Sequence, residues 1–314
     1  MKMTSVIDAR DLTKKYKHAT ALDNVCLSIE KDSIYGLLGR NGAGKTTLMS
    51  ILTAQNFATS GVVEIFGEHP YENASVLNRM CFVRESQKYP EDATAKHAIA
   101  TARLFFPCWD QSLAEELIDD FRLPLKTPIK KLSRGQQSAV GVIIGLASRA
   151  EITFFDEPYL GFDAVARQMF YDRLIADYAE CPRTIVLSSH LIDEVANLIE
   201  NVIVIDRGRI IMDESTEEAR TRAVNIVGDA DSVQRLVAGR EVIHREALGR
   251  VSSVTILGQL SDVDREFIAD ANLDLTPVSL QQLIVRTTRA DTTSSNEDEN
   301  TGPLTDTDVR SLQS

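Results

Sequence analysis

The chain has 314 residues, of which 43% are hydrophobic and 25% are charged, and its formal net charge is −12 at pH 7. These values are typical of a globular protein and exclude a fibrous or wholly disordered chain. The acidic balance argues against binding along a nucleic-acid backbone, because that depends on clustered Lys and Arg. The length indicates one large domain with a smaller appendage.

The four cysteines are scattered without C-x-x-C spacing, which favours neither a zinc site nor a disulfide framework and fits a reducing compartment. Residues 1–10 contain no apolar stretch of the kind found in secretion signals. The longest aliphatic run, Ala139–Ala147, is about half the roughly 20 residues of a membrane-spanning helix. We therefore expect a chain that is neither secreted nor inserted in a membrane.

The first part of the chain is predicted to form strands, then a glycine-rich loop and a helix. The apolar pattern favours strands over Ser5–Leu12 and Val25–Ile29, with Lys14–His18 as a solvated hairpin turn. The apolar run Ile34–Leu38 is predicted to be a strand that leads directly into the loop, and residues 46–54 are compatible with a helix after it.

The loop reads GRNGAGKTT over residues 39–47 and fits the pattern G-x-x-x-x-G-K-[ST]. Backbone N–H groups of such a loop converge on a β-phosphate, Lys45 can reach the β- and γ-phosphate oxygens, and the Thr46 hydroxyl can bind Mg²⁺. The loop residues predicted to bind phosphate are Gly39, Asn41, Gly42, Gly44, Lys45, Thr46 and Thr47.

The middle of the chain is predicted to add strands at residues 62–67 and 80–83, then an inserted helical subdomain at about 91–148. Gly141 and Gly145 lie four residues apart on one helical face, which lets another element pack closely. Apolar strands at 152–155, 184–187 and 202–205 alternate with helical pattern, which is typical of a parallel sheet covered on both faces.

The last third of the chain is predicted to leave this α/β core. A short strand at 210–212 and a helix at 214–222 precede a boundary, which gives a first domain at 1–217. Strand-like and helix-like segments then indicate a small α+β domain at 218–288. Residues 289–314 are acidic, rich in Thr and Ser and nearly devoid of apolar residues, so we expect a disordered tail.

Three further segments carry polar residues at predicted strand ends or helix starts. Residues 152–158 read ITFFDEP, so Asp156 can bind the Mg²⁺ shell and Glu157 can polarise a water molecule. Residues 132–137 read LSRGQQ and begin a second helix, whose first turn can bind an anion. Two phosphate-directed helix starts in one domain suggest a head-to-tail dimer in which each nucleotide lies between the loop of one copy and this segment of the other. His190 follows a strand, where ligands bind in such sheets. Gln87, by itself, is uninformative.

In this order, the motifs closely resemble the nucleotide-binding subunit of ATP-binding cassette (ABC) transporters over residues 1–215. The resemblance implies a P-loop NTPase fold with a mixed sheet and a helical subdomain. It also implies ATP hydrolysis with Mg²⁺ and a dimer with a second cassette, identical or different. The helical subdomain would contact a separate membrane permease, which would hold the chain on the cytoplasmic face of the cell membrane. The second domain resembles that of drug-, peptide- and lipid-exporting members.

The resemblance also implies residue roles. Tyr16 would stack on adenine, Asp163 would communicate across the dimer, and Gln87 would bind Mg²⁺ and the attacking water. The residues that would meet the second copy's nucleotide are Ser133, Gly135 and Gln136. The implied metal ligands are Thr46, Gln87 and Asp156, and the implied catalytic residues are Glu157, His190 and Gln87.

Three segments depart from the family's usual pattern. Arg134 replaces the first glycine of the signature Leu-Ser-Gly-Gly-Gln, Phe162 stands where leucine is common, and Glu85-Ser86 precede Gln87 where proline is common. These departures bear on the rate and symmetry of hydrolysis rather than on the class.

Other functions stay open at this point. A soluble ATPase of the same family, acting in DNA repair or on ribosomes, would carry a long coiled coil or a second cassette, and neither is present. A GTPase or small-molecule kinase would not explain the segment at 132–137, and a GTPase would need an Asn-Lys-x-Asp segment. A regulatory binding module without turnover is opposed by Glu157 and His190.

Overall fold

The computed structural model describes residues 5–85 and 87–288. The chain divides into two compact units, with the boundary between Thr216 and Glu217. The predicted tail at 289–314 lies outside the described residues.

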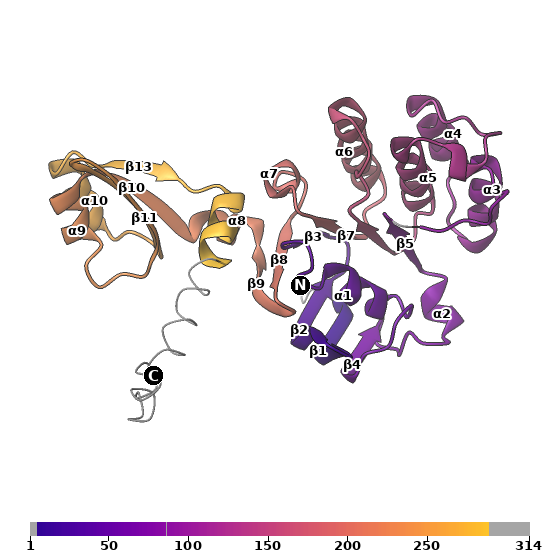
Figure 1. Cartoon of the computed structure of the whole chain (residues 1–314), viewed down its shortest axis with the longest axis horizontal. Helices are drawn as coiled ribbons and strands as arrows, with labels where there is room; N and C mark the ends of the chain where they lie inside the picture. The colour runs from indigo at the N-terminus through magenta and orange to yellow at the C-terminus, as the bar shows by residue number, and fades with distance from the viewer. Residues whose placement is uncertain (1–4, 86, 289–314) are drawn as a thin grey trace, which may run out of the picture. The chain divides into compact units, whose positions relative to one another are not determined.

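A six-stranded sheet in the order β5-β6-β7-β3-β8-β9 forms the centre of the first unit (Figure 1). The strands β5 to β8 and β3 run parallel, and β9 is added antiparallel to β8 at one edge. This confirms the predicted α/β fold with a mixed sheet. Every residue of β3 and β6 is buried, as expected for apolar strands covered on both faces. The bounds are β3 Ile34–Leu38, β5 Met80–Arg84, β6 Ile152–Asp156, β7 Thr184–Ser189, β8 Asn201–Asp206 and β9 Arg209–Ser215.

A three-stranded antiparallel sheet in the order β2-β1-β4 completes the β structure of this unit. Its strands are β1 Ser5–Tyr16, β2 Ala19–Glu30 and β4 Ser60–Ile65. The predicted hairpin turn at 14–18 is therefore too long, because backbone pairing continues to Tyr16 and Ala19 and only two residues form the turn. The lysines of this segment suggested a loop, yet Lys14 and Lys15 lie on the paired strand β1.

Several helices of the first unit, though not α1 or α7, begin at side chains that accept hydrogen bonds from backbone N–H groups. Such caps are Thr94, Asp110, Ser133 and Asp163. Figure 1 shows α3, α4 and α5 gathered together, apart from the three-stranded sheet. The bounds are α1 Lys45–Leu52, α2 Ala74–Leu77, α3 Ala95–Phe105, α4 Gln111–Asp120, the 3-10 helix Ile129–Lys131, α5 Arg134–Ala147, α6 Ala164–Glu180 and α7 Ile192–Val195. Helix α8, Thr216–Thr221, begins at the boundary between the two units.

Two glycines of α5 let this helix pack closely on the sheet. A Cβ atom at Gly145 would lie 2.4 Å from Phe155 Cε1, and one at Gly141 would lie 2.8 Å from Val83 Cγ1. Both approaches are shorter than van der Waals contact permits. The predicted close packing at these positions is confirmed, and it brings the second half of α5 against β5 and β6.

The second unit has the chain order β-α-β-β-α-β and an antiparallel sheet in the order β11-β12-β10-β13, which is a ferredoxin-like arrangement. Its elements are β10 Ala223–Asp229, α9 Ala230–Leu236, β11 Val242–Leu248, β12 Val251–Leu257, α10 Asp262–Asp270 and β13 Asp274–Pro277, followed by a helix at 280–288. The sequence pattern did not predict β11 or β13. All four residues of β13 are exposed, and so is the second half of β11, so neither strand has a regular apolar alternation.

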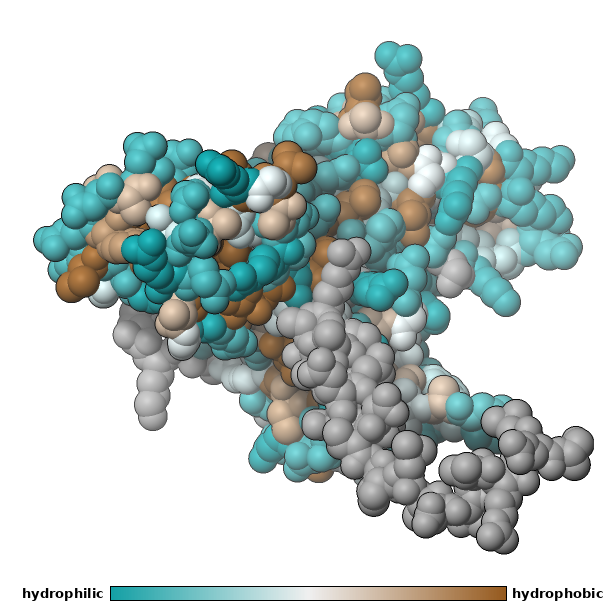
Figure 2. Space-filling view, turned by 60° about the vertical axis from the view of Figure 1, so that its left-hand side comes forward, coloured by the Kyte–Doolittle hydropathy of each residue, from teal (hydrophilic) through white to brown (hydrophobic). Residues whose placement is uncertain are grey.

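The surface seen in Figure 2 is mainly hydrophilic, with hydrophobic residues scattered over it. Within the described part of the chain, no helix has the length and apolar character required to cross a membrane.

Candidate functional site

Three segments predicted to carry the chemistry meet at one edge of the central sheet. The strands β3, β7 and β6 are parallel neighbours, and Leu38 pairs with Ser189 while Asp156 pairs with Ser188. The carboxyl ends of parallel strands lie at the same edge of a sheet. The loop after β3, the acids at the end of β6 and His190 after β7 are therefore brought together.

A cleft of about 500 Å³ opens at this edge. Eight of the predicted site residues line it: Asn41, Gly42, Gly44, Lys45, Thr46, Thr47, Glu157 and His190. The cleft is also lined by Ala21, Arg40, Glu85, Arg134 and Leu160. Its size and its glycine-rich, mixed polar lining suit a small phosphorylated ligand.

The loop between β3 and α1 needs glycine at two positions. Gly44 has φ +118°, and a Cβ atom there would lie 2.7 Å from the carbonyl oxygen of Ala21. A Cβ atom at Gly39 would lie 2.2 Å from the carbonyl oxygen of Ile205. The loop closes on Lys45, whose Nζ donates to the carbonyl oxygens of Gly39 at 2.7 Å and Arg40 at 3.2 Å.

The hydroxyl and carboxylate predicted to bind a metal ion are in direct contact. Thr46 Oγ1 donates to Asp156 Oδ2 at 2.7 Å, and Ser188 Oγ donates to the other carboxylate oxygen at 2.7 Å. The Asp156 side chain is therefore fixed on both sides. A hydroxyl and a carboxylate suit Mg²⁺, which prefers oxygen ligands and usually binds proteins through one or two carboxylates.

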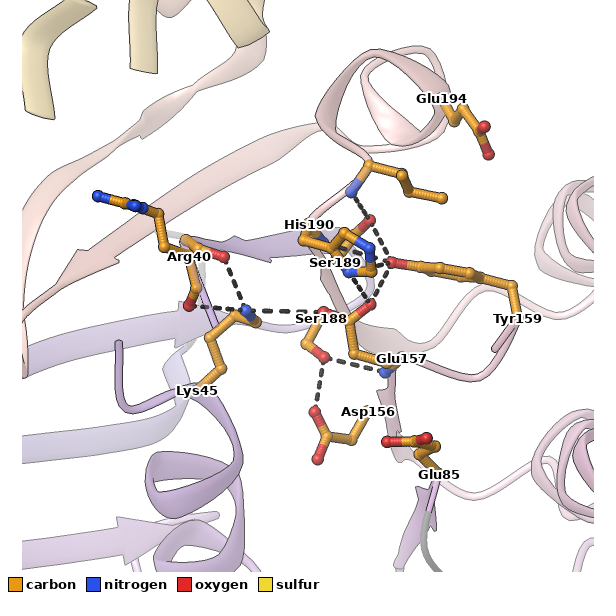
Figure 3. A network of polar contacts seen from close by, with 12 residues as sticks. Arg40, Lys45, Glu85, Asp156, Glu157, Tyr159, Ser188, Ser189, His190 and Glu194 are labelled. Carbon is orange, nitrogen blue, oxygen red and sulfur yellow. Dashed lines mark hydrogen bonds and ion pairs between the residues drawn. The ribbon is translucent and has the colours of Figure 1, made fainter. Parts of the chain in front are cut away.

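Glu157 is held beside this pair in a left-handed backbone conformation, with φ 49°. Such a conformation is unusual outside glycine and is found preferentially at functional sites. Glu157 Oε1 lies 3.6 Å from Lys45 Nζ and has no hydrogen-bond partner among residues 5–85 and 87–288. Its Oε2 lies 2.8 Å from His190 Nδ1 and accepts a hydrogen bond from the Tyr159 hydroxyl (Figure 3).

Gln87 is exposed and, in the described part of the chain, is not among the residues that line the cleft. Glu85, two residues earlier, does line it. Strand β5 ends at Arg84 beside Asp156, and Glu85 N donates to the carbonyl oxygen of Asp156 at 3.2 Å. The residue that reaches the cleft is thus the first one after the strand, and the role of Gln87 stays a prediction.

Arg134, which stands where the family usually has glycine, contacts another residue that lines the cleft. The Arg134 guanidinium donates a hydrogen bond to the Glu85 carboxylate, and both side chains line the cleft. The contact joins the first residue of α5 to the segment that follows β5. An exposed ion pair of this kind contributes little to stability by itself. It nevertheless places one charge of each sign at the mouth of the cleft.

The predicted signature residues lie at the start of α5. Ser133 and Gln136 form a capping box, and a Cβ atom at Gly135 would lie 2.6 Å from the carbonyl oxygen of Gly161. Asp163 caps α6 and accepts from Ala166 N at 2.8 Å. Among the described residues, none of these four predicted site residues lines the cleft, so their roles toward a second copy's nucleotide stay predictions.

Tyr16 also lies outside the described lining of the cleft. It is 50% exposed at the end of β1, and its hydroxyl accepts a hydrogen bond from Asn56 Nδ2 at 3.0 Å. One face of an aromatic ring that is half exposed can stack on a base. Its predicted contact with adenine is not tested by these positions.

Sequence reasoning missed three polar residues around Glu157: Tyr159, Ser188 and Ser189. The serines come directly before His190 at the end of a strand, and that position was the available signal. Tyr159 comes two residues after Glu157, but its sequence position does not reveal that its hydroxyl turns back onto the carboxylate.

A family model described as ABC transporter matches residues 22–160. The bacitracin transport ATP-binding protein BcrA of Bacillus licheniformis is 30% identical over 213 residues, which cover 67% of this chain and 69% of that protein. The Nod factor export ATP-binding protein I of Ralstonia nicotianae is 27% identical over 227 residues, which cover 70% of each chain.

The fold is also that of solved ATP-binding cassettes. The dimeric post-hydrolysis structure of the cassette MJ0796, bound to ADP and phosphate, superposes with a TM-score of 0.59 at 23% identity. The match covers 67% of this chain and 98% of that one. At 23% identity, this similarity supports a shared fold and nothing more specific.

We predict that Lys45→Ala weakens the binding of ATP about 10- to 100-fold, because a hydrogen bond to a charged group is worth roughly 1.5–3 kcal/mol. Lys45 is 6% exposed within the loop. Lys130→Ala is the matched control, because Lys130 is half exposed and pairs with Glu91 away from the cleft. Isothermal titration of both variants with ATP measures the effect. Equal affinity in the Lys45 variant and the control would contradict the assignment of the loop.

Proposed function

The chain belongs to the ABC transporter family of ATP-binding proteins, and on that premise we propose that it drives an exporter as one of two cassettes on a separate membrane permease. Proteins of this family bind and hydrolyse ATP, and this chain is an ATPase of that class. Their names as transport subunits favour this function over a soluble ATPase. The observation that carries the proposal is the convergence of Lys45, Thr46, Asp156, Glu157 and His190 at one cleft edge.

The binding step uses the loop. Lys45 Nζ donates to two loop carbonyl oxygens and lies 3.6 Å from Glu157. A triphosphate bound in the cleft would accept hydrogen bonds from this ammonium group in place of those contacts. Backbone N–H groups at the start of α1 add partial positive charge at the same place. Thr46 and Asp156 would hold Mg²⁺, which, when bound, neutralises charge on the phosphate oxygens.

The hydrolytic step uses Glu157. Its Oε1 is buried and lacks a hydrogen-bond partner among the described side chains, so it is available to orient a water molecule and accept its proton. His190 lies on the other side of the carboxylate, with its ring at the cleft. It can therefore contact both Glu157 and the terminal phosphate.

A second cassette would complete the site. In this chain, Ser133, Gly135 and Gln136 lie at the first turn of α5, where N–H groups and the helix dipole favour an anion. Since they do not line the chain's own cleft as described, they are free to face the nucleotide of another copy. The MJ0796 cassette is dimeric in its solved post-hydrolysis state, which supports this arrangement. The second copy would be identical or a different cassette.

A groove on the helical subdomain is the proposed contact with the permease. Its volume is about 560 Å³, and it is lined largely by apolar side chains of α3 and of the segment before it. These include Tyr89, Pro90, Ala98, Ala102 and Phe105. A short amphipathic helix on the cytoplasmic side of a permease fits such a groove. Only three residues lie between Tyr89 and Glu85, which lines the cleft, so the groove can respond to ATP.

The direction of transport is proposed from the relatives. One is named for the export of Nod factors, and another, an osmoprotectant protein OsmV of Salmonella typhimurium, is named for import. The exporter is covered over 70% of its length and the importer over 62%. The exporter therefore agrees better with this chain in length, which supports export.

We predict that Glu157→Gln lowers ATP turnover about 100-fold or more, because general-base catalysis typically contributes that much. The amide keeps the size of the side chain, so ATP should still bind and hold two copies together. Light scattering with MgATP should then give about twice the chain mass of 34.8 kDa. Glu246→Gln in the second unit is the control. Unchanged turnover would remove Glu157 from its role, and a single-copy mass at saturating ATP would contradict the dimer.

We predict that Phe105→Asp abolishes binding to permease-containing membranes, because it puts a charge into the apolar groove. Phe105 is 64% exposed, so the isolated chain should fold and bind ATP normally. Val263→Asp, at a residue 74% exposed on α10, is the matched control. The measurement is sedimentation of the purified chain with inside-out vesicles from the source cells and with vesicles of lipid alone. Binding to lipid alone, or full binding by the Phe105 variant, would contradict a permease in this groove.

A further inference from the structure

The Tyr159 hydroxyl is the centre of a buried polar chain next to Glu157. The side chain is 2% exposed. Its hydroxyl bonds to Glu157 Oε2, lies 2.8 Å from Ser189 Oγ and accepts from His190 N at 3.3 Å. Figure 3 shows these groups turned toward one another at the ends of β6 and β7.

The direction of the protons follows from the chemistry of the groups. A carboxylate only accepts, so the single proton of Tyr159 is donated to Glu157. The phenol oxygen must then accept from Ser189, whose Oγ accepts in turn from Leu191 N at 2.9 Å. Hydrogen bonds in such a chain strengthen one another. Burial first, and the neighbouring Glu157 second, raise the pKa of Tyr159, so the phenol keeps its proton.

We propose that Tyr159 is a positioning residue for hydrolysis: it anchors Oε2 of Glu157 and thereby holds Oε1, which accepts no hydrogen bond from the described residues, beside Lys45 Nζ at the cleft. This inference rests on the proposed role of Glu157 as the base. The terminal torsion of a glutamate side chain is broad, so its own rotamer does not fix the carboxylate. Without the phenol, Oε2 keeps only its contact with His190, and the carboxylate can rotate about this torsion and lose the orientation that a water molecule requires.

The alternative is that Tyr159 only fills space. Its ring packs near Tyr171, with ring centroids 6.5 Å apart, and near His190. Tyr171 is also buried, and its hydroxyl lies 3.5 Å from Glu194 rather than on Glu157. Tyr171 is therefore a matched control: packing alone predicts the same small effect when either hydroxyl is removed.

The test compares Tyr159→Phe with Tyr171→Phe, measuring kcat, KM and melting temperature of the full chain with MgATP. The Tyr159 variant should lose about 10-fold or more in kcat with KM unchanged, as expected for a lost hydrogen bond to a charged group that acts on the reacting geometry. Tyr171→Phe should stay within about twofold of the unmodified chain, since a peripheral hydroxyl does not act on the reacting groups. A kcat for Tyr159→Phe equal to that of Tyr171→Phe would overturn the proposal.

Two further variants separate the possible failures. Ser189→Ala removes the donor to the Tyr159 oxygen and should lower kcat with KM unchanged. If Tyr159→Phe does not fold, Ser189→Ala serves as the test, and an unchanged kcat in Ser189→Ala overturns the proposal. Glu157→Gln tests the role on which the inference rests. Normal turnover in that variant would refute the proposed base, whereas lost turnover there with normal kcat in Tyr159→Phe would refute the positioning role alone.

Discussion

A hydrogen bond of 2.7 Å between Thr46 Oγ1 and Asp156 Oδ2 joins two segments that lie 110 residues apart in the chain. It can form because β3 and β6 both run parallel to β7 and end at one edge of the sheet. Ser188, on the strand between them, fixes the second oxygen of Asp156. The glycine-rich loop, the Thr46–Asp156 pair and the residues around Glu157 all depend on this alignment, because a shift of one strand would separate the loop from the acids.

Charged groups at the cleft are held in place by neighbouring polar groups of the chain. The ammonium group of Lys45 is held by loop carbonyl oxygens, and the carboxylate of Glu157 is held by Tyr159 and His190. Such preorganisation reduces the rearrangement needed when charge develops on the phosphate during hydrolysis. The ion pair of Arg134 with Glu85 adds a contact between the first residue of α5 and the segment after β5, and both side chains line the cleft.

The parts of this architecture with strong local patterns were predictable from the sequence. The buried strands β3, β6, β7 and β8 are continuous apolar runs, and the phosphate loop requires glycines whose spacing is visible in the sequence. Contacts that depend on register were not predictable. Glu85 lines the cleft because β5 ends at Arg84, beside the end of β6. The Tyr159 hydroxyl contacts Glu157 after a change of chain direction at Glu157 itself, whose backbone is left-handed. Exposed strands such as β13 lack an apolar alternation and are set by pairing with β10.

The central claim is that Thr46 and Asp156 hold a magnesium ion against the phosphates of ATP. It is tested most directly by titrating Asp156→Asn and the unmodified chain with a non-hydrolysable ATP analogue, once with Mg²⁺ and once with EDTA. The account predicts that both proteins bind the analogue equally in EDTA, and that Mg²⁺ tightens binding only to the unmodified chain. A variant that gains the full effect of Mg²⁺ would contradict it.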